Sequence, residues 1–401
     1  MEQSTIQHRY SNTRLAEIAL ALGGFALGTS EFSAMGMLTN ISLSLEISET
    51  QVGHLISSYA LGVVVGAPLI AIFGSFISRK NLIVLLMLFF AMGNLASAIS
   101  PDYLSLMLWR FISGLPHGAY FGVGALVATS LVPADQRAKA VSRFMLGVTL
   151  SIVIGTPLAT WLGQYINWRY TFVIVSLLAL FSAAMAYFYI PQNPNEKQSN
   201  PLNEISALKL TQVWLTLGIA AIGFSGMFCV FSYLGPTLIF VTKIQEFWIP
   251  FIISIFGIGS VFGAMVGGWL CDKYQFNSVG YILIGYIIIL LGFPFMAQSI
   301  WSMIPASFFL GCLMALSPAL QIRLMDVSAN APTLAVSLSH AAFNFANALG
   351  PFLGGVAITL GFGWCVTGYI GAFTALAGLI IFCIAKYVEQ RKIASNCVIQ
   401  N

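Results

Sequence analysis

Glu31 lies well past the middle of an apolar segment, LALGGFALGTSEFSAMGML at residues 20–38. A charged side chain at the centre of a bilayer costs about 2.5 to 3.5 kcal/mol on insertion scales, so it marks a functional site by default. An ionised carboxylate offers only hydrogen-bond acceptors, and it can take up and release a proton. We therefore interpret Glu31 as a candidate functional residue.

A second charge, Arg110, is expected at a similar depth in a later apolar segment. A helix that enters the membrane near Ile18 places Glu31 about 20 Å in, and one that enters from the other side at Tyr103 places Arg110 about 10 Å in. Opposite charges in lipid cost less when they face each other or a shared wet cavity. His117 shares the helical face of Arg110. Glu31, Arg110 and His117 are therefore our candidates for work on a substrate or for proton coupling.

Structural alternatives stay open for these residues. The guanidinium of Arg110 has five donors and can instead clamp backbone carbonyls of the glycine-rich first segment. An interior histidine such as His117 most often serves only as a hydrogen-bonding group. For Glu31 the alternative is weaker, because an ionised carboxylate has no donor with which to clamp a helix.

A second polar set recurs at spacings of three and four and therefore shares one helical face: Ser337, His340, Asn344 and Asn347. In lipid such a face points inward, where it either hydrogen-bonds neighbouring helices or lines the route of a polar substrate. Aromatic residues also crowd the segments expected around a central cavity, although most of them are packing residues. Our candidates for the substrate cavity are Phe32, Tyr59, Phe121, Phe228, Tyr233, His340, Asn344 and Asn347.

Composition fixes the class of protein. Of the 401 residues, 58% are hydrophobic and 7% are charged, against roughly a quarter charged in a soluble domain. Apolar runs long enough to cross a bilayer as helices recur along the chain. The basic residues are scattered rather than gathered in a patch, so we expect no nucleic-acid partner, and the six cysteines form no CxxC pair. We expect no metal and no cofactor.

The elements that must position these side chains are apolar runs broken by charge, Pro or Asn and Gln. They predict an all-α polytopic membrane protein with twelve transmembrane helices. The spans lie near 15–40, 52–74, 81–99, 103–127, 140–163, 170–190, 211–235, 247–270, 278–297, 301–320, 334–358 and 364–385. If the termini and the even-numbered connections are cytoplasmic, nearly all Lys and Arg lie on that side, and only Arg169 and Lys243 face outward. This asymmetry predicts two cytoplasmic termini.

The chain also divides into two similar halves. A polar segment rich in Pro and Asn, residues 191–210, is expected to be a cytoplasmic linker between six-helix halves at 1–190 and 211–401. ISSYALGVVVGA at 56–67 aligns with ISIFGIGSVFGA at 253–264, a shift of 197 residues, with identity at half of the positions. A parallel six-helix repeat is typical of transporters with two rocking halves.

Several motifs together resemble the major facilitator superfamily, in its twelve-helix drug/proton antiporter branch. WRFISGLPHGAYFGVG (109–124) looks like the helix-four motif of that branch, and GTSEF (28–32) is similar to its acidic helix-one pattern. YALGVVVGAP (59–68) and GTPLATWLGQYINWRYTF (155–172) look like the bacterial arabinose-efflux-permease-like exporters. The resemblance implies two pseudo-symmetric halves around a cavity that opens alternately to either side, and proton-driven export. It makes Glu31 the acid that takes a proton from outside and Arg110 the arginine that tunes it.

One motif departs from the family. The loop after helix two normally has an Asp and a Gly where this chain has Ser75 and Ser78, which leaves Arg79 and Lys80. The second half keeps a better copy, GGWLCDK at 267–273, with Asp272. We expect Arg79, Lys80 and Asp272 to act in a cytoplasmic gate.

We therefore expect a monomeric, proton-coupled exporter of a small organic solute, drug-like or sugar-like, in a bacterial inner membrane. The nearest alternative is an uptake symporter or facilitator for sugars or nucleosides. A membrane-embedded enzyme is disfavoured, because the spans carry no paired carboxylates, no His/Asp/Glu cluster at helical spacing and no GxSxG motif. A passive assembly subunit would leave the duplicated halves and the buried charges unexplained.

Overall fold

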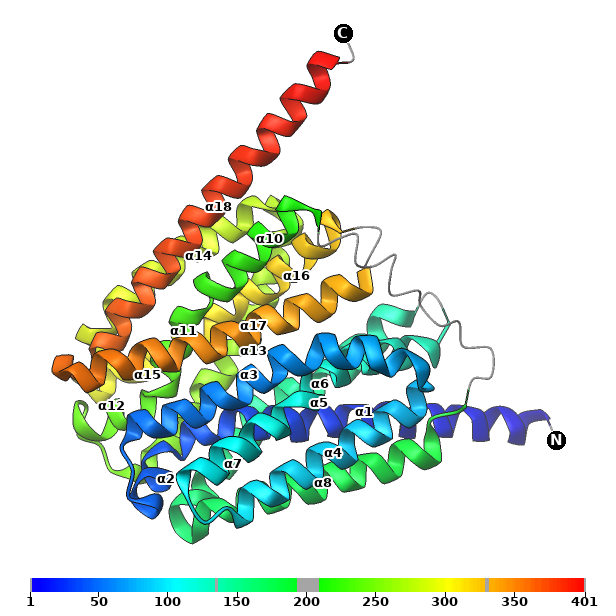
Figure 1. Ribbon diagram of the computed structural model, residues 1–401, viewed down its shortest axis with the longest axis horizontal. Coiled ribbons are helices and arrows are strands. Elements are labelled where there is room, and N and C mark those ends of the chain that lie inside the picture. Colours follow the sequence, from blue (N-terminus) through cyan, green and yellow to red (C-terminus); the bar gives the residue numbers. More distant parts are fainter. Residues whose placement is uncertain (1, 134–135, 193–208, 329–331, 400–401) are drawn as a thin grey trace. The chain divides into compact units, whose positions relative to one another are not determined.

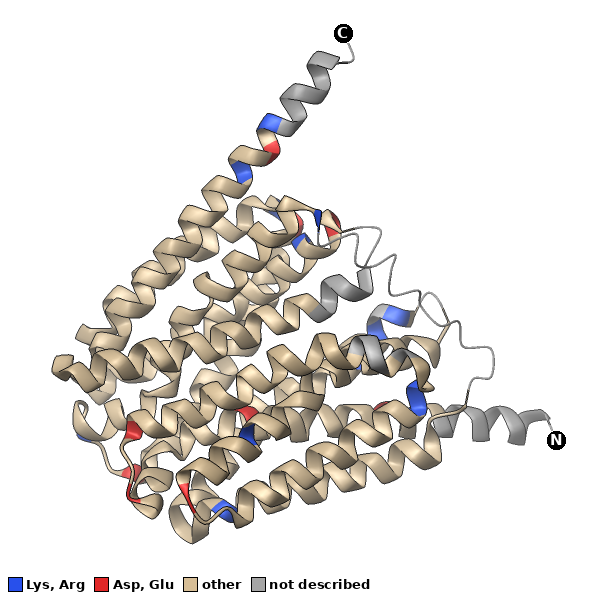
Figure 2. Ribbon diagram, in the orientation of Figure 1, with Lys and Arg blue, Asp and Glu red and all other residues tan. Residues whose placement is uncertain are grey.

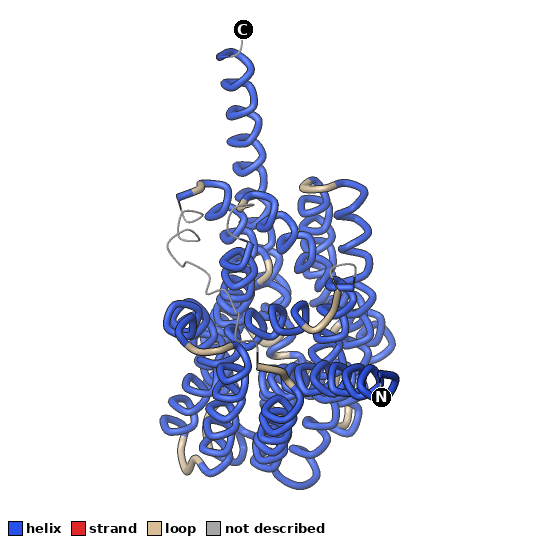
Figure 3. Tube along the Cα trace, turned by 90° about the vertical axis from the view of Figure 1, so that its right-hand side faces the viewer, coloured by secondary structure: helices blue, strands red, loops and turns tan. Residues whose placement is uncertain are grey.

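The structure, a computed structural model, describes residues 2–133, 136–192, 209–328 and 332–399 (Figure 1). Every regular element in this part of the chain is a helix, and Figure 3 shows helices joined by loops there, with no strand. The linker expected at 191–210 lies almost wholly outside the described residues, and so do the side chains of Ser75 and Ser337.

Eleven helical segments are long and apolar enough to cross a membrane. One of them, Lys139–Tyr189, has 51 residues, about 75 Å of helix or more than twice the thickness of the hydrocarbon core. The backbone is extended within it at Asn167 (φ −172°, ψ 134°), where the next helix begins. The portions before and after Asn167 both pack along the first helix of the chain. The segment is therefore two spans, and the expected twelve transmembrane helices are confirmed.

Contacts divide the chain into two compact units, of which the first comprises Met1–Ser199 and Gln245–Gly257. Its helices are α1 (Glu2–Gly36), α2 (Leu38–Leu45), α3 (Glu49–Phe73), α4 (Arg79–Ile99), α5 (Tyr103–Ser130), α6 (Arg137–Leu150), α7 (Thr156–Leu162) and α8 (Trp168–Tyr189), with π-helical turns η3 (Ser151–Gly155) and η4 (Gly163–Asn167) around α7. Within this unit α5 packs against α3 and α4, while α1 packs against α6 and α8.

The second unit comprises Asn200–Ile244 and Ile258–Asn401. Its helices are α10 (Thr211–Gly218), the π-helical η6 (Ile219–Gly223), α11 (Ser225–Ser232), α12 (Leu234–Phe240), most of α13 (Ile249–Tyr274), α14 (Asn277–Met296), α15 (Ile300–Cys312), α16 (Leu316–Val327), α17 (Pro332–Ala357), the π-helical η9 (Ile358–Phe362) and α18 (Val366–Ile399). Within this unit α11 packs against α17 and α18, and α14 packs against α18.

Polar residues at the helix starts explain where several spans begin. Ser48 and Gln51 form a capping box at the start of α3, and Asp102 and Ser105 form another at the start of α5. Each box satisfies backbone N–H groups that have no intrahelical partner. Charged residues lie mostly near helix ends, and the long middles of the helices are almost free of them (Figure 2).

The internal repeat recurs in the packing of the helices. A β-carbon at Gly62 would lie 2.1 Å from the carbonyl oxygen of Phe111, and one at Gly259 would lie 2.1 Å from that of Phe308. Both members of the first pair map onto the second by the 197-residue shift. Glycine lets the two backbones approach this closely, as expected of small residues in membrane helices. The two halves therefore repeat one helix-to-helix contact.

The first span of each half is interrupted at a similar place. Helix α1 gives way to α2 at Met37 (φ −104°, ψ 15°), and α11 gives way to α12 at Tyr233 (φ −106°, ψ 17°). Nearly the same shift in sequence relates these positions, and their backbone angles agree within a few degrees. Broken helices in matching positions of two repeats are typical of secondary transporters.

Candidate proton site

Arg110 of α5 holds α1 through a single residue. Its Nη1 donates to Ser30 Oγ at 2.9 Å and its Nη2 donates to the Ser30 carbonyl oxygen at 3.0 Å. The Ser30 hydroxyl in turn donates to Asn94 Oδ1 of α4 at 2.7 Å, and Asn94 Nδ2 donates to the Phe90 carbonyl at 2.9 Å. Arg110 is 1% exposed. A buried hydrogen-bonded chain therefore joins α5, α1 and α4.

Aromatic rings surround the same guanidinium. The Arg110 Cζ lies 4.1 Å from the centroid of the Tyr59 ring of α3 and 5.2 Å from that of Phe172 of α8. A desolvated cation over an aromatic face gains about 2 kcal/mol. Arg110 thus contacts three other helices of its unit, α1, α3 and α8, and these contacts fix its position within the bundle.

Glu31 directly follows Ser30, the residue that Arg110 binds, and its carboxylate pairs with a histidine. The Glu31 carboxylate, on α1, has Oε2 3.7 Å from His117 Nε2, on α5. The other ring nitrogen of His117, Nδ1, lies 2.7 Å from the Tyr59 hydroxyl. The Phe121 ring lies 5.1 Å from the His117 ring. Glu31, His117 and Tyr59 are all buried, with 8%, 3% and 1% of their surfaces exposed.

The three candidates for proton coupling are therefore neighbours in one unit. Arg110 binds Ser30, the residue next to Glu31. Of the two interpretations of Arg110, the geometry matches the clamp on backbone of the first helix. The short contact of Glu31 is to His117, a pairing that depth alone did not single out.

Two residues of this network were missed at the level of sequence. Asn94 is fully buried. It is a polar residue within an apolar span, which is the same signal in the sequence that singled out Glu31. Ser30 gave no signal, because a small hydroxyl residue is ordinary in membrane helices. The approach of α1 to its neighbours depends on small residues, since a β-carbon at Gly28 would lie 2.1 Å from Ser151 Oγ.

The remaining cavity candidates of the first unit surround this network. Phe32 is 6% exposed and Phe121 is 2% exposed. The Phe121 ring is tilted by 35° to the Phe144 ring, with the two centroids 5.6 Å apart. Tyr59 contacts both Arg110 and His117. In the structure all three are therefore buried side chains beside the proton site.

The second unit carries the polar face of α17. Asn344 Nδ2 donates to the His340 carbonyl oxygen of the same helix at 3.0 Å, and Asn344 and Asn347 are both buried. The Tyr233 hydroxyl, beside the break in α11, donates to the Pro351 carbonyl at 2.8 Å. Phe228 lies edge-on to Phe224 at 5.4 Å. Tyr233 thus ties α11 to α17.

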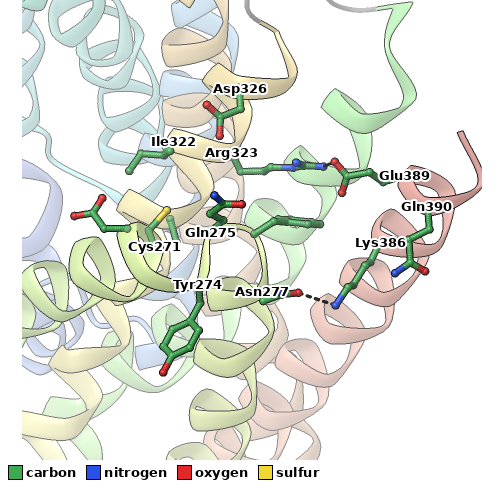
Figure 4. A pocket seen from close by; sticks show the side chains of 13 residues that line it. Cys271, Tyr274, Gln275, Asn277, Ile322, Arg323, Asp326, Lys386, Glu389 and Gln390 are labelled. Carbon is green, nitrogen blue, oxygen red and sulfur yellow. Dashed lines mark hydrogen bonds and ion pairs between the residues drawn. The ribbon is translucent and has the colours of Figure 1, made fainter. Parts of the chain in front are cut away.

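The candidate gating residues lie at helix ends. Arg79 and Lys80 are the first two residues of α4, directly after the N-cap residue Ser78. The Lys80 ammonium lies 5.4 Å from the centroid of the Tyr187 ring. In the second unit, Asp272 lines a cavity of about 560 Å³ between the C-terminal ends of α13 and α16 and the middle of α18 (Figure 4).

Arg323, which lines that cavity, binds residues from several helices. It pairs with Glu389 of α18 at 2.9 Å and donates to Gln212 Oε1 of α10 at 3.3 Å. Its Cζ lies 4.0 Å from the centroid of the Phe276 ring. Lys386 Nζ donates to Asn277 Oδ1 at 2.6 Å, as drawn in Figure 4. Sequence reasoning missed this network, although a basic residue at the end of a span was a usable signal.

Within the described residues, no group of three His, Cys, Asp or Glu side chains is placed to hold a metal ion.

Comparison with known proteins places this geometry in a family. The family model described as Major Facilitator Superfamily matches residues 20–333 and 251–396. The chain is 36% identical over 381 residues to the inner membrane transport protein YdhP of Escherichia coli strain K12, covering 94% of this chain and 98% of that one. It is 34% identical to AraJ of the same strain, covering 93% and 96%.

Two further matches are a relative in sequence and a solved structure. A chloramphenicol resistance protein of Streptomyces lividans is 30% identical over 370 residues, covering 90% of this chain and 92% of that one. The crystal structure of a mutant of the nucleoside transporter NupG superposes with a TM-score of 0.75 at 14% identity, covering 93% and 99%. The match to AraJ confirms the resemblance to arabinose-efflux-permease-like proteins. The chain belongs to the Major Facilitator Superfamily, and it is a multi-pass membrane transporter.

Proposed function

We propose that this transporter exports a small organic solute across the bacterial inner membrane in exchange for protons. The buried pair of Glu31 and His117 is the single observation that carries the proposal. A carboxylate that is 8% exposed within a membrane-spanning helix is costly unless it is used or paired. The similarity to a chloramphenicol resistance protein supports export as the direction.

In the proposed cycle Glu31 binds a proton when the site is open to the outside and releases it when the site is open to the cytoplasm. Burial favours the neutral acid, whereas the positive charge of Arg110 and a donor on His117 favour the carboxylate. Opposed influences of this kind allow one group to change its protonation state as its surroundings change. Arg110 acts as a structural anchor that also supplies a fixed positive charge.

The remaining assignments complete the proposal. The halves at 1–190 and 211–401 move as units, both termini are cytoplasmic, and the protein works as a monomer. The solute contacts side chains from both halves, namely Phe32, Tyr59, Phe121, Phe228, Tyr233, His340, Asn344 and Asn347. Arg79, Lys80 and Asp272 contribute to the gate on the cytoplasmic side.

Inverted membrane vesicles test both coupling and direction. A resistance and growth screen of an overexpressing strain, with chloramphenicol among the compounds, first selects a substrate. Respiration then acidifies the vesicle lumen, and the substrate is added outside, which corresponds to the cytoplasmic face. An exporter that exchanges solute for protons raises the luminal pH. A symporter or a facilitator gives no such rise.

Glu31→Gln is the decisive variant. It removes the titratable group and keeps the shape of the side chain, so substrate-dependent proton release should be lost. The matched control is Glu17→Gln, since Glu17 is also on α1 and 8% exposed but pairs with Arg143 at 2.6 Å. Accumulation against a gradient by Glu31→Gln, driven by the proton-motive force, would refute the assignment of Glu31.

A further inference from the structure

Tyr59 contacts both His117 and Arg110. Its hydroxyl lies 2.7 Å from His117 Nδ1, and the face of its ring lies 4.1 Å from the Arg110 guanidinium. It is 1% exposed, and its backbone is close-packed, since a β-carbon at Gly114 would lie 2.1 Å from the Tyr59 carbonyl oxygen. The hydroxyl is therefore held in a fixed place relative to the imidazole.

The two nitrogens of His117 meet groups of different chemistry. Nε2 faces Glu31 Oε2 at 3.7 Å, and an ionised carboxylate accepts hydrogen bonds but cannot donate them. Nδ1 faces a tyrosine hydroxyl, which can both donate and accept. A neutral imidazole carries its proton on one nitrogen only, and the partner of the other nitrogen selects which one. The arrangement is satisfied when Tyr59 donates to Nδ1 and His117 keeps its proton on Nε2.

We propose that Tyr59 is a positioning residue that fixes the tautomer of His117, so that Nε2–H points at the Glu31 carboxylate. This inference rests on the proposed function for its consequence in transport, although the tautomer itself does not. With the Tyr59 hydroxyl removed, the proton of His117 can occupy Nδ1. The Nε2 lone pair then faces the carboxylate, and the ionised form of Glu31 loses a donor.

The other polar groups near the pair, from α5 and α4, bind Ser30 and the Phe90 carbonyl. Arg110, on the same helix as His117, commits Nη1 and Nη2 to Ser30. Asn94, on α4, commits its amide nitrogen to the Phe90 carbonyl and its oxygen to Ser30. The hydroxyl of Tyr59 is thus the group placed to set which nitrogen of His117 carries the proton.

Nitrogen-15 NMR of the full-length protein in lipid vesicles, with labelled histidine, reads the tautomer directly and needs no substrate. The chain has four histidines, and a His117→Gln spectrum identifies the signals of His117. Protonated and unprotonated ring nitrogens have well-separated chemical shifts. At a pH where Glu31 is ionised, we expect the wild type to carry the proton of His117 on Nε2. A wild-type spectrum with the proton on Nδ1 would overturn the proposal without any further variant.

Tyr59→Phe is the test variant, because it keeps the ring over Arg110 and removes only the hydroxyl. Loss of one buried hydrogen bond should lower the ratio of the Nε2–H to the Nδ1–H tautomer about tenfold. The matched control is Tyr103→Phe. The Tyr103 hydroxyl lies 3.0 Å from Nδ1 of another histidine, His54, so this variant should change the His54 signals and leave those of His117 as they are. An unchanged His117 tautomer in Tyr59→Phe would also overturn the proposal.

Transport separates the two proposals. If Tyr59→Phe changes the tautomer and also moves the pH dependence of substrate-driven proton release, both hold. If the tautomer changes while Glu31→Gln still couples solute to protons, the positioning by Tyr59 stands and the proposed proton site fails.

Discussion

The Arg110 guanidinium binds two polar atoms of one residue, the hydroxyl oxygen of Ser30 at 2.9 Å and its backbone carbonyl oxygen at 3.0 Å. A helix carbonyl seldom accepts a second hydrogen bond from a charged donor buried in the membrane, because few such donors exist there. Because Ser30 directly precedes Glu31, these two hydrogen bonds fix the depth and rotation of α1 relative to α5 close to Glu31. They therefore set where the carboxylate of Glu31 meets His117.

We expect Arg110→Lys to lower the free energy of unfolding by about 3 kcal/mol, measured by titration with SDS in mixed micelles. An ammonium keeps the charge, but it cannot reproduce the two parallel donors or the flat contact with the Tyr59 ring. Arg143→Lys is the control, because Arg143 also binds α1, through Glu17, but with 43% of its side chain exposed. An exposed pair contributes about 0.5 kcal/mol. Equal losses for the two variants would contradict a structural role specific to Arg110.

Much of the site could be predicted from isolated polar residues in apolar segments. Burial of a charge in lipid is so costly that Glu31, Arg110 and His117 stand out in one sequence, and helix rise alone placed Glu31 and Arg110 at one depth. Their partners could not be assigned, because rise gives depth but not rotation about the helix axis. Whether Glu31 faces Arg110 or His117 is decided by side-chain rotamers and by close helix packing.

The fold was predictable for a different reason. Hydropathy and the requirement for satisfied backbone in lipid leave helices as the only solution for such segments, and the glycine repeat marked the equivalent helices of the two halves. The interruptions at Met37 and Tyr233 were not predicted. Pro236, three residues after Tyr233, has no N–H with which to continue α11, so it accounts for the break there. The first proline of the chain is Pro68, so the break at Met37 depends on tertiary packing.

Two glycines of α13 provide a matched test of close packing. A β-carbon at Gly263 would lie 2.4 Å from the Cys312 carbonyl oxygen, whereas one at Gly268 meets nothing within 4 Å. We expect Gly263→Ala to destabilise the protein by about 1 to 3 kcal/mol through overpacking. Gly268→Ala should be neutral or stabilising by up to about 1 kcal/mol, because alanine is the better helix former. Thermal unfolding in detergent compares the two, and a neutral Gly263→Ala would show that α13 and α15 can separate without cost.

Cytoplasmic termini are a prediction from the distribution of Lys and Arg, and reporter fusions check it. Green fluorescent protein fused after Asn401 should fluoresce in cells, and alkaline phosphatase fused there should be inactive, since the first folds in the cytoplasm and the second outside it. Fusions truncated in the connection near Lys243 should give the opposite pattern. Active phosphatase at the C-terminus would reverse the topology and, with it, the side from which Glu31 receives its proton.

Replacement of His117 should change the pH dependence of transport rather than the binding of solute. In His117→Gln the carboxylate of Glu31 loses an imidazole that can also become a cation, so the carboxylate form is less stabilised and proton release occurs at higher pH. A change of about one pH unit in the half-maximal rate corresponds to 1.36 kcal/mol of lost interaction. The measurement is substrate-driven proton release in inverted vesicles across a pH series, with the solute concentration for half-maximal rate recorded at each pH. His54→Gln serves as the control, because His54 contacts Tyr103 rather than a carboxylate. A pH profile equal to that of the wild type in His117→Gln would remove His117 from the coupling site and leave Glu31 to titrate alone.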